Sequence, residues 1–362
     1  MPSIQLDLLL VLAAFAKGDN TSFNTLTDIK GVLDCKILSI EVLPLIASFT
    51  FTPESTRSTI FLAVALSNWV WDMPKSEAIP IVDLSGPNVK SDLDVPFAFS
   101  QGFVKKRSAT IVEVKTNEGI VGWGEAFCQG LEPPEISAAV IENALKPILV
   151  EQSPLDIEVL WHNMYNVTRD FGRKGSVISA ISAIDIALWD IAGKYYNQPI
   201  HQLLGGAFRK KIKPYATGFY RLKGKGEANR LAEEALSHFE NGFDHMKVKL
   251  GFGIDDDLKC METIRNALKN KNVTLMIDTN HAYGRSEALI LGRNLEDFRL
   301  RWYEEPLVPE DIKGYAELRS KLDIPIAGGE NEHTLYGFRS LFENNAIDIA
   351  QPDIGSCGGI TG

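Results

Sequence analysis

The chain has 362 residues, of which 45% are hydrophobic and 23% charged, and its formal net charge is −10. This length suits two domains, or one large barrel with an accessory domain, and the composition is that of a globular protein. The acidic balance argues against nucleic acid or an anionic membrane as the main partner. The four cysteines are scattered without a CxxC spacing, so we expect neither a disulfide framework nor a zinc site, and a reducing compartment is favoured.

Two apolar stretches near the N-terminus have the composition of targeting or membrane segments. Leu6–Ala16 resembles the core of a signal peptide, but no Lys or Arg precedes it and Asp7 interrupts it. Ile60–Trp71 is shorter than the roughly 20 residues that a membrane-spanning helix needs. We therefore expect a cytoplasmic protein without a membrane span, and residues 1–33 are expected to be an atypical N-terminal extension.

Residues 34–208 have the mixed pattern of an α+β domain. Lys36–Leu45 and Val95–Glu125 are predicted to be strands, the second stretch with a turn at its TNEG segment. Between them, the segment from about residue 46 to residue 92 shows no clear apolar periodicity and is expected to be an insertion. From Pro133 to Leu204 the pattern is helical, with VISAISAIDIALWDIAGKYY as its strongest segment, and a pair of glycines ends the region.

Strand and helix patterns alternate after Gly206. Because regular βα repetition implies parallel strands, residues 209–362 are predicted to form a TIM-type barrel. A closed barrel needs about eight strands, so we expect an α/β barrel that is truncated after about six. The candidate strands are Lys213–Phe219, His245–Leu250, Val273–Thr279, Leu300–Glu305, Ile324–Gly329 and Ile347–Asp353.

Acidic residues end three successive candidate strands. Asp278, Glu304 and Glu330 follow one another at steps of 26 residues, which is one βα unit each. Chemistry in such barrels lies at the carboxyl ends of the strands, so the three carboxylates should converge. Converging like charges need a cation, and oxygen ligands without His or Cys suit Mg²⁺. The sequence therefore predicts a magnesium site.

Two lysines share one face of the strand before these acids. In HMKVKL the apolar side chains alternate with Lys247 and Lys249, which must point the same way. Beside a metal and its carboxylates, one ammonium can hold a substrate carboxylate. The other can act as a base if neighbouring cations lower its pKa.

Simpler interpretations exist for each of these residues. Two lysines in a strand commonly form a solvated face, and an acid at the end of a strand commonly caps the next helix. Glu305, next to a proline, is expected to point away from the metal and to make a structural contact. Glu332 and His333 either line the pocket or cap a helix. The regular spacing of the three acids, in register with the lysine pair, favours the functional interpretation.

Several motifs together resemble the enolase superfamily, in particular the mandelate racemase/muconate lactonizing enzyme family and its galactonate- and rhamnonate-like acid-sugar dehydratases. The similarity covers roughly Val95–Gly362 and Lys36–Leu45. It implies a modified (β/α)7β barrel with an N-terminal capping domain, Mg²⁺ as cofactor, and a small-molecule carboxylate as substrate. The motifs are SAIDIALWDIAGK, LLGG, KVK, DTNHAY, WYEEP, GGENEH and QPDIGSCGGITG.

Site roles follow from this resemblance. It makes Asp278, Glu304 and Glu330 the metal ligands, Lys249 the base that removes the proton α to the carboxylate, and Lys247 its partner. It makes Asp353 the residue that orients a catalytic histidine. Asp185 and Asp190 become structural residues at the junction of cap and barrel. Candidates for substrate contact are Asn280, His281, Lys105 and Lys106, the last two in a basic turn that is alternatively a solvated surface.

Dehydration of a sugar acid to a 2-keto-3-deoxy acid is the favoured reaction. A racemase, an epimerase or a cycloisomerase on the same scaffold remains an alternative, as does a non-catalytic product that binds metal or a sister subunit. The family's barrel continues past GGITG through a strand that supplies the catalytic histidine. We therefore expect a C-terminally incomplete chain that is inactive as a dehydratase, and a homo-oligomer for the complete enzyme.

Overall fold

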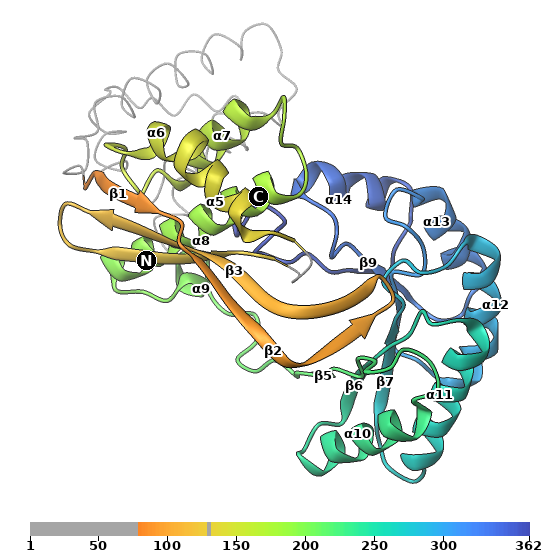
Figure 1. The fold of residues 1–362 in the computed structure, drawn as a ribbon. Helices are drawn as coiled ribbons and strands as arrows, with labels where there is room; N and C mark the ends of the chain where they lie inside the picture. Colours follow the sequence, from red (N-terminus) through yellow and green to blue (C-terminus); the bar gives the residue numbers. More distant parts are fainter. Residues whose placement is uncertain (1–78, 129–131) are drawn as a thin grey trace, which may run out of the picture. The chain divides into compact units, whose positions relative to one another are not determined.

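The computed structural model describes residues 79–128 and 132–362. The predicted strand at Lys36–Leu45, the expected extension at residues 1–33 and most of the expected insertion lie outside the described residues. The described part begins with an antiparallel sheet and its helices and continues with a parallel sheet whose helices lie along one side of it (Figure 1).

The first sheet contains four antiparallel strands: β1 (Ile81–Ser85), β2 (Asn88–Phe99), β3 (Gly102–Thr116) and β4 (Val121–Ala126). The long strand β3 pairs with each of the other three. The predicted turn between β3 and β4 is confirmed, with the Gly119 amide donating to the Thr116 carbonyl at 3.1 Å. This sheet supplies the hairpin β2–β3, whose tip reaches the parallel sheet through a bridge between Ala98 and Arg221.

The expected insertion does not extend to residue 92. Strand β1 and the first part of β2 occupy Ile81–Asp92 and pair with β3. The pattern was missed because most side chains of β2 are exposed, so the apolar alternation that identifies a half-buried strand is absent there. In β1 only Ile81 and Leu84 are buried.

The helical segments that follow this sheet in the described chain are α5 (Pro134–Val140), η1 (Ile141–Leu145), α6 (Lys146–Leu149), α7 (Ile157–Thr168), α8 (Ser176–Tyr196) and α9 (Ile200–Leu203). The central helix α8 matches the strongest predicted segment. It lies directly against β4, because a Cβ at Gly122 or Gly124 would fall 2.1 or 1.9 Å from backbone oxygens of α8. In the described chain α8 alone is long and apolar enough to cross a membrane, and 67% of its apolar window is buried inside the protein.

The six predicted parallel strands are all present. They pair in sequential order from β5 to β10, each with its neighbour in the chain. Within the described residues the sheet is open, with β5 and β10 as its outer strands, so it forms a continuous part of a barrel wall and not a closed barrel. The strands are β5 (Ala216–Thr217), β6 (His245–Lys249), β7 (Thr274–Asp278), β8 (Tyr303–Glu304), β9 (Ile326–Gly328) and β10 (Ile349–Ala350).

Five amphipathic helices cover the outer face of the parallel sheet (Figure 1). Leu231, Ile264, Leu291, Leu318 and Leu341, one from each helix, are buried in a common core with the strands. Burial of this apolar face fixes which side of each strand points toward the helices, and the alternate side chains therefore point to the opposite face. The helices are α10 (Ala228–Glu240), α11 (Ile254–Ala267), α12 (Arg285–Leu295), α13 (Ile312–Lys321) and α14 (Thr334–Glu343).

Candidate metal and acid–base site

Three carboxylates meet at the carboxyl ends of adjacent strands. Asp278 ends β7, Glu304 ends β8, and Glu330 follows β9 by two residues. Parallel pairing places Asp278 beside Glu304 in the sheet. One carboxylate oxygen from each of the three residues lies within 4.8 Å of the others. The structure thus brings together the acids that the sequence spacing had singled out.

Both lysines of β6 point into the same cluster. Nζ of Lys247 lies 2.5 Å from Oε1 of Glu304 and 3.4 Å from Oδ2 of Asp278. Nζ of Lys249 donates to Oδ2 of Asp278 and, at 3.0 Å, to Oδ1 of Asn280. Each lysine side chain is 8% exposed. Two ammonium groups and three carboxylates therefore share one buried space.

Direct contacts with carboxylates raise the pKa of both lysines. Burial alone would lower the pKa of Lys247, but the charges of Asp278 and Glu304 outweigh it and raise that pKa above its ordinary value. Burial likewise opposes the charged form of Lys249, and Asp278 again raises the net pKa. A lysine pKa lowered by neighbouring cations was expected for a site that holds a metal ion, and it stays a prediction for that state.

The pKa values of the three carboxylates shift in different directions. Burial and the charge of Asp278 raise the pKa of both Glu304 and Glu330. Burial also opposes the charged form of Asp278, but the positive charges of Lys249 and Lys247 outweigh it and lower the pKa of Asp278 below its ordinary value. All of the converging ligand atoms are oxygens, the donor set that Mg²⁺ prefers, and the residues therefore fit a divalent cation.

Two further side chains hold Glu304, and sequence reasoning missed both. Oε2 of Glu304 accepts hydrogen bonds from Nε1 of Trp302 at 2.9 Å and from Nε2 of Gln351 at 2.7 Å. The position of Trp302 could have been anticipated, because residues two apart in a strand share a face. Gln351 is 47 positions away, and no local pattern connects it with Glu304.

Glu305, which was expected to point away from the metal, lies beside the cluster, and its Oε2 accepts a hydrogen bond from Nδ2 of Asn280 at 3.5 Å. The Glu305 backbone is left-handed, with φ of 42°, and its Oε1 accepts a hydrogen bond from Nδ2 of Asn331 at 2.7 Å. Burial, together with the charges of Glu330 and Asp278, raises the pKa of Glu305 to about 8. The contact with Asn331 ties the loop after β8 to the loop after β9.

Asn280 and His281 form a left-handed turn after β7, with φ of 41° and 51°. The Asn280 side chain joins the cluster through Lys249, whereas His281 is held through its backbone amide, which donates to the Glu305 carbonyl at 2.8 Å. The tip of hairpin β2–β3 contacts this turn. Oγ of Ser100 donates to the Thr279 carbonyl at 2.8 Å, and Nε2 of Gln101 donates to the Asn280 carbonyl at 2.7 Å.

The remaining predicted site residues are Asp353, Lys106 and Lys105. Oδ1 of Asp353 accepts a hydrogen bond from the Gly355 amide at 2.7 Å, and the charge of Asp353 contributes to the raised pKa of Glu330. Lys106 lies opposite Asp92 in the register of β2 and β3, and the pKa of Glu135 is lowered mainly by a hydrogen bond from Lys90 and to a small extent by the charge of Lys106. Its neighbour Lys105 is exposed on the same strand.

Glu332 and His333 contact the cap. Lys174 lies 2.6 Å from Oε1 of Glu332, and the Gly175 amide donates to Nε2 of His333 at 3.1 Å. Both partners precede helix α8. The loop that carries Glu330 is thus fixed from the cap side as well as from the sheet.

Asp185 and Asp190 both make structural contacts from α8. Oδ2 of Asp185 accepts the backbone amides of Ile360 and Thr361 at 2.7 and 3.0 Å. Asp190 accepts the Trp123 amide at 2.9 Å.

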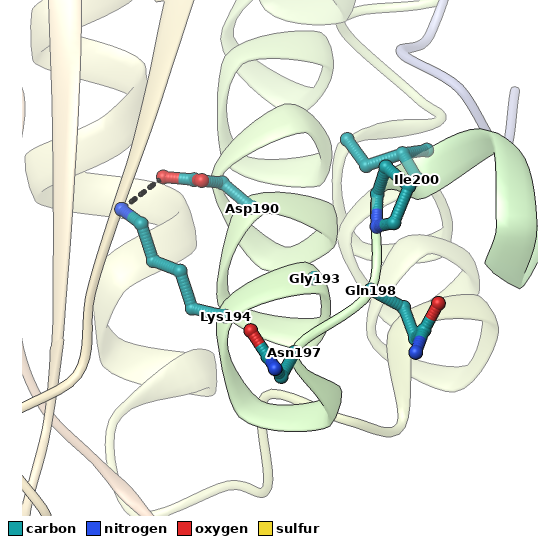
Figure 2. Close-up of a pocket in the computed structure, with 7 residues that line it drawn as sticks. Asp190, Gly193, Lys194, Asn197, Gln198 and Ile200 are labelled. Carbon is teal, nitrogen blue, oxygen red and sulfur yellow. Dashed lines mark hydrogen bonds and ion pairs between the residues drawn. The ribbon is translucent and has the colours of Figure 1, made fainter.

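Asp190 also lines an open pocket of about 400 Å³ at the C-terminal end of α8. Figure 2 shows its ion pair with Lys194, whose Nζ is 2.7 Å from Oδ2 of Asp190. The charged groups of this pocket neutralise each other, so it offers no unpaired charge to a substrate carboxylate.

Comparison with known families identifies both halves of the described chain. Residues 81–205 match the N-terminal domain of mandelate racemase/muconate lactonizing enzyme. Residues 230–362 match the enolase C-terminal domain-like family. The boundary between the two matches falls in the segment that joins α9 to α10.

Known relatives include two curated enzymes. D-galactarolactone cycloisomerase of Agrobacterium fabrum is 40% identical over 269 residues, covering 74% of this chain and 70% of the relative. Arabinonate dehydratase of Saccharolobus solfataricus is 36% identical over 250 residues, covering 69% and 66%. The chain therefore spans about two thirds of the length of these relatives.

Among solved structures, one similar protein is a mutant of L-talarate/galactarate dehydratase liganded with Mg and L-glucarate. It is 28% identical, with a TM-score of 0.73, and the match covers 79% of this chain and 72% of that one.

Proposed function

Because the chain belongs to the mandelate racemase/muconate lactonizing enzyme family of the enolase superfamily, we propose that its site removes the proton α to the carboxylate of a sugar acid. The observation that carries this proposal is the convergence of three carboxylates and two lysines in one buried cluster at the carboxyl ends of β6 to β9. The names of the related enzymes refer to galactarolactone, arabinonate and talarate/galactarate, and these compounds suggest the substrate class.

Asp278, Glu304 and Glu330 are the residues that would hold Mg²⁺. The fit rests on their oxygen donors, one from each residue, which lie within 4.8 Å of one another. When bound, the ion supplies positive charge that stabilises the developing negative charge of a deprotonated carboxylic acid.

We assign different roles to Lys249 and Lys247. Lys249 lies beside Asn280 at the end of β6, and we assign it the removal of the α-proton. Lys247 is two residues earlier on the same face, and its ammonium is assigned to hold the substrate carboxylate. Since both lysines now pair with Asp278 or Glu304, the substrate must take over some of these contacts when it binds.

We assign to Asn280 a contact with a hydroxyl of the substrate, because its Oδ1 accepts a hydrogen bond from Nζ of Lys249. Asp353, at the carboxyl end of β10, is assigned to orient a general acid. The contacts of Lys105 and Lys106 lie on the cap sheet, and a role for them in substrate binding remains a prediction.

We favour dehydration to a 2-keto-3-deoxy acid, by a hydro-lyase of the cytoplasm. Arabinonate dehydratase and the talarate/galactarate dehydratase support this outcome. Cycloisomerisation of a sugar-acid lactone is the second candidate, supported by the 40% identity with D-galactarolactone cycloisomerase. Both reactions begin with the same proton removal, so the cluster serves either.

Proton exchange tests the shared first step without requiring either final product. The purified chain is incubated in D₂O with Mg²⁺ and a panel of aldonates, aldarates and their lactones, and deuterium at C2 is followed by NMR. We expect exchange that depends on Mg²⁺ and disappears with EDTA. A panel without any metal-dependent exchange, on protein shown by calorimetry to bind Mg²⁺, would contradict the proposed function. Mass analysis of the same samples distinguishes loss of water from isomerisation.

A further inference from the structure

The two carboxylate oxygens of Glu304 have different partners. Oε1 accepts from Nζ of Lys247 at 2.5 Å, and the same ammonium lies 3.4 Å from Oδ2 of Asp278. Oε1 is therefore the oxygen that faces the cluster. Oε2 instead accepts from the indole of Trp302 at 2.9 Å and from the amide of Gln351 at 2.7 Å.

The donors to Oε2 are held rigidly. Trp302 is 7% exposed, packs with Met276 and Ala327, and meets the ring of Tyr215 edge-on at 5.5 Å. Gln351 follows β10, and its backbone amide donates to the Gly328 carbonyl at 3.0 Å. Movement of the Trp302 indole would disturb this packing, and the backbone of Gln351 is tied to β9.

A carboxylate oxygen offers about two lone-pair sites. Oε2 uses both for Trp302 and Gln351, so it has none left for a metal ion. Oε1 alone remains available to a cation at the cluster.

Building on the proposed metal site, we infer that Trp302 and Gln351 are positioning residues that restrict Glu304 to one coordinating oxygen and thereby favour Mg²⁺ over Ca²⁺. Mg²⁺ requires a compact octahedron, which suits ligands that each give one oxygen. Ca²⁺ accepts six to eight oxygens and commonly takes both oxygens of one carboxylate. Hydrogen bonds that occupy Oε2 withhold the second oxygen from the larger ion.

The test uses Trp302→Phe and Gln351→Met, singly and combined, in the full 362-residue chain. Both replacements keep most of the side-chain volume and remove the donor. Calorimetry with MgCl₂ and with CaCl₂, in the absence of substrate, gives the two dissociation constants. We expect Mg²⁺ affinity to fall about 10-fold in each single variant, in the range known for outer contacts of metal ligands. We expect Ca²⁺ affinity to stay constant or rise, so the preference for Mg²⁺ falls.

Trp161→Phe is the matched control. Trp161 is 5% exposed, and its indole donates to the Gly358 carbonyl at 2.7 Å, so the replacement also deletes one buried indole hydrogen bond. Because Trp161 lies in the cap, Trp161→Phe should leave the affinities for Mg²⁺ and for Ca²⁺ unchanged.

Equal weakening of Mg²⁺ and Ca²⁺ binding would overturn the inference, as would no change for either ion. If Trp302→Phe does not fold, Gln351→Met carries the test alone, because it frees the same oxygen. Asp278→Asn separates this inference from the proposed site. Loss of Mg²⁺ binding in Asp278→Asn, with an unaltered Mg²⁺/Ca²⁺ ratio in the two positioning variants, rejects the inference and leaves the site intact. Retained Mg²⁺ binding in Asp278→Asn rejects the site itself.

Discussion

Asp185 in the cap and Asp278 in the parallel sheet are both fully buried aspartates, yet their surroundings differ. Asp185 accepts two backbone amides, those of Ile360 and Thr361. Asp278 accepts the Asn280 amide as well, but it also pairs with Lys249, shares Lys247 with Glu304, and has a carboxylate oxygen within 4.8 Å of one from Glu330. Of the two aspartates, only Asp278 has neighbouring carboxylates, and a bound cation would relieve the repulsion among them.

Burial alone therefore does not distinguish a functional carboxylate from a structural one. Backbone amides are fixed parts of the fold, and the two that bond Oδ2 of Asp185 are not exchangeable partners. Ammonium groups on long side chains can move away and be replaced by a metal ion or a substrate. The useful signal is the kind of donor and the number of like charges around the group.

The largest expected effect in this comparison comes from Lys249→Ala. Removal of a general base typically costs roughly 10² to 10⁴ in rate, and deuterium exchange at C2 should fall by about that factor. Mg²⁺ affinity should not weaken, because the variant removes a cation that competes for Asp278. Exchange at the unaltered rate would show that the base is another group.

Asp278→Asn should have the next largest effect. It removes one of the three ligand charges, and we expect Mg²⁺ affinity measured by calorimetry to fall by more than about 100-fold, beyond the range for outer contacts. The thermal stability of the metal-free chain should change little, because the loss also relieves repulsion with Glu304. A large loss of stability with unchanged Mg²⁺ affinity would assign Asp278 to the structural class.

Asp185→Ala should show the opposite pattern. Two buried amides lose their acceptor, which costs roughly 1–3 kcal/mol for an unsatisfied buried group, so the free energy of unfolding should fall while Mg²⁺ affinity stays constant. Asp185→Asn keeps an acceptor oxygen and serves as the control. Weaker Mg²⁺ binding in Asp185→Ala, in protein that remains folded, would contradict the separation of the two regions.

The pH dependence of stability sharpens the same contrast. Burial raises the pKa of Asp185 above its ordinary value of 3.8, although hydrogen bonds from Thr361 and Ile360 oppose the shift. The folded state therefore binds the proton more tightly than the unfolded state. The resulting contribution to stability is present below pH of about 4 and is lost as the pH rises through the folded-state pKa. Denaturant unfolding at several pH values should show this decline in the native chain and not in Asp185→Asn.

The smallest effect is expected at the pocket of Figure 2. Lys194→Met breaks the ion pair with Asp190, in which both side chains are partly exposed. Such pairs on a helix contribute about 0.3–0.5 kcal/mol, so chemical denaturation should register a shift of that size at most. C2 exchange and Mg²⁺ affinity should be unaltered. A fall in exchange would indicate that this pocket, and not only the carboxylate cluster, contributes to function.

Sequence patterns could predict the parts of this molecule that repeat. The six parallel strands are apolar and evenly spaced, and the acids at their ends recur with the same interval, so periodicity alone places Asp278, Glu304 and Glu330 together. The part of strand β2 before Val95 was missed because its solvated side chains carry no apolar alternation.

Relations between distant side chains were beyond sequence reasoning. The hydrogen bond from Gln351 to Glu304 depends on the three-dimensional path of β8 and β10. The raised pKa of Lys247 depends on which carboxylate its ammonium approaches, which spacing cannot decide. Periodicity thus identifies the elements and their charged ends, whereas the pairing of charges requires the folded structure.

The contacts between the cap and the barrel wall have a consequence for the order of folding. Ser100 and Thr279 are 179 positions apart in the chain, and Trp161 and Gly358 are 197 apart. Closing loops of this length costs chain entropy before any contact compensates for it, so proteins rich in such contacts fold slowly. The turn that carries Asn280 is thus expected to reach its final geometry late, after the strands and helices on either side of it have formed. In pulsed hydrogen exchange during refolding, the amides of Asn280 and His281 should gain protection after those of α8 and α11.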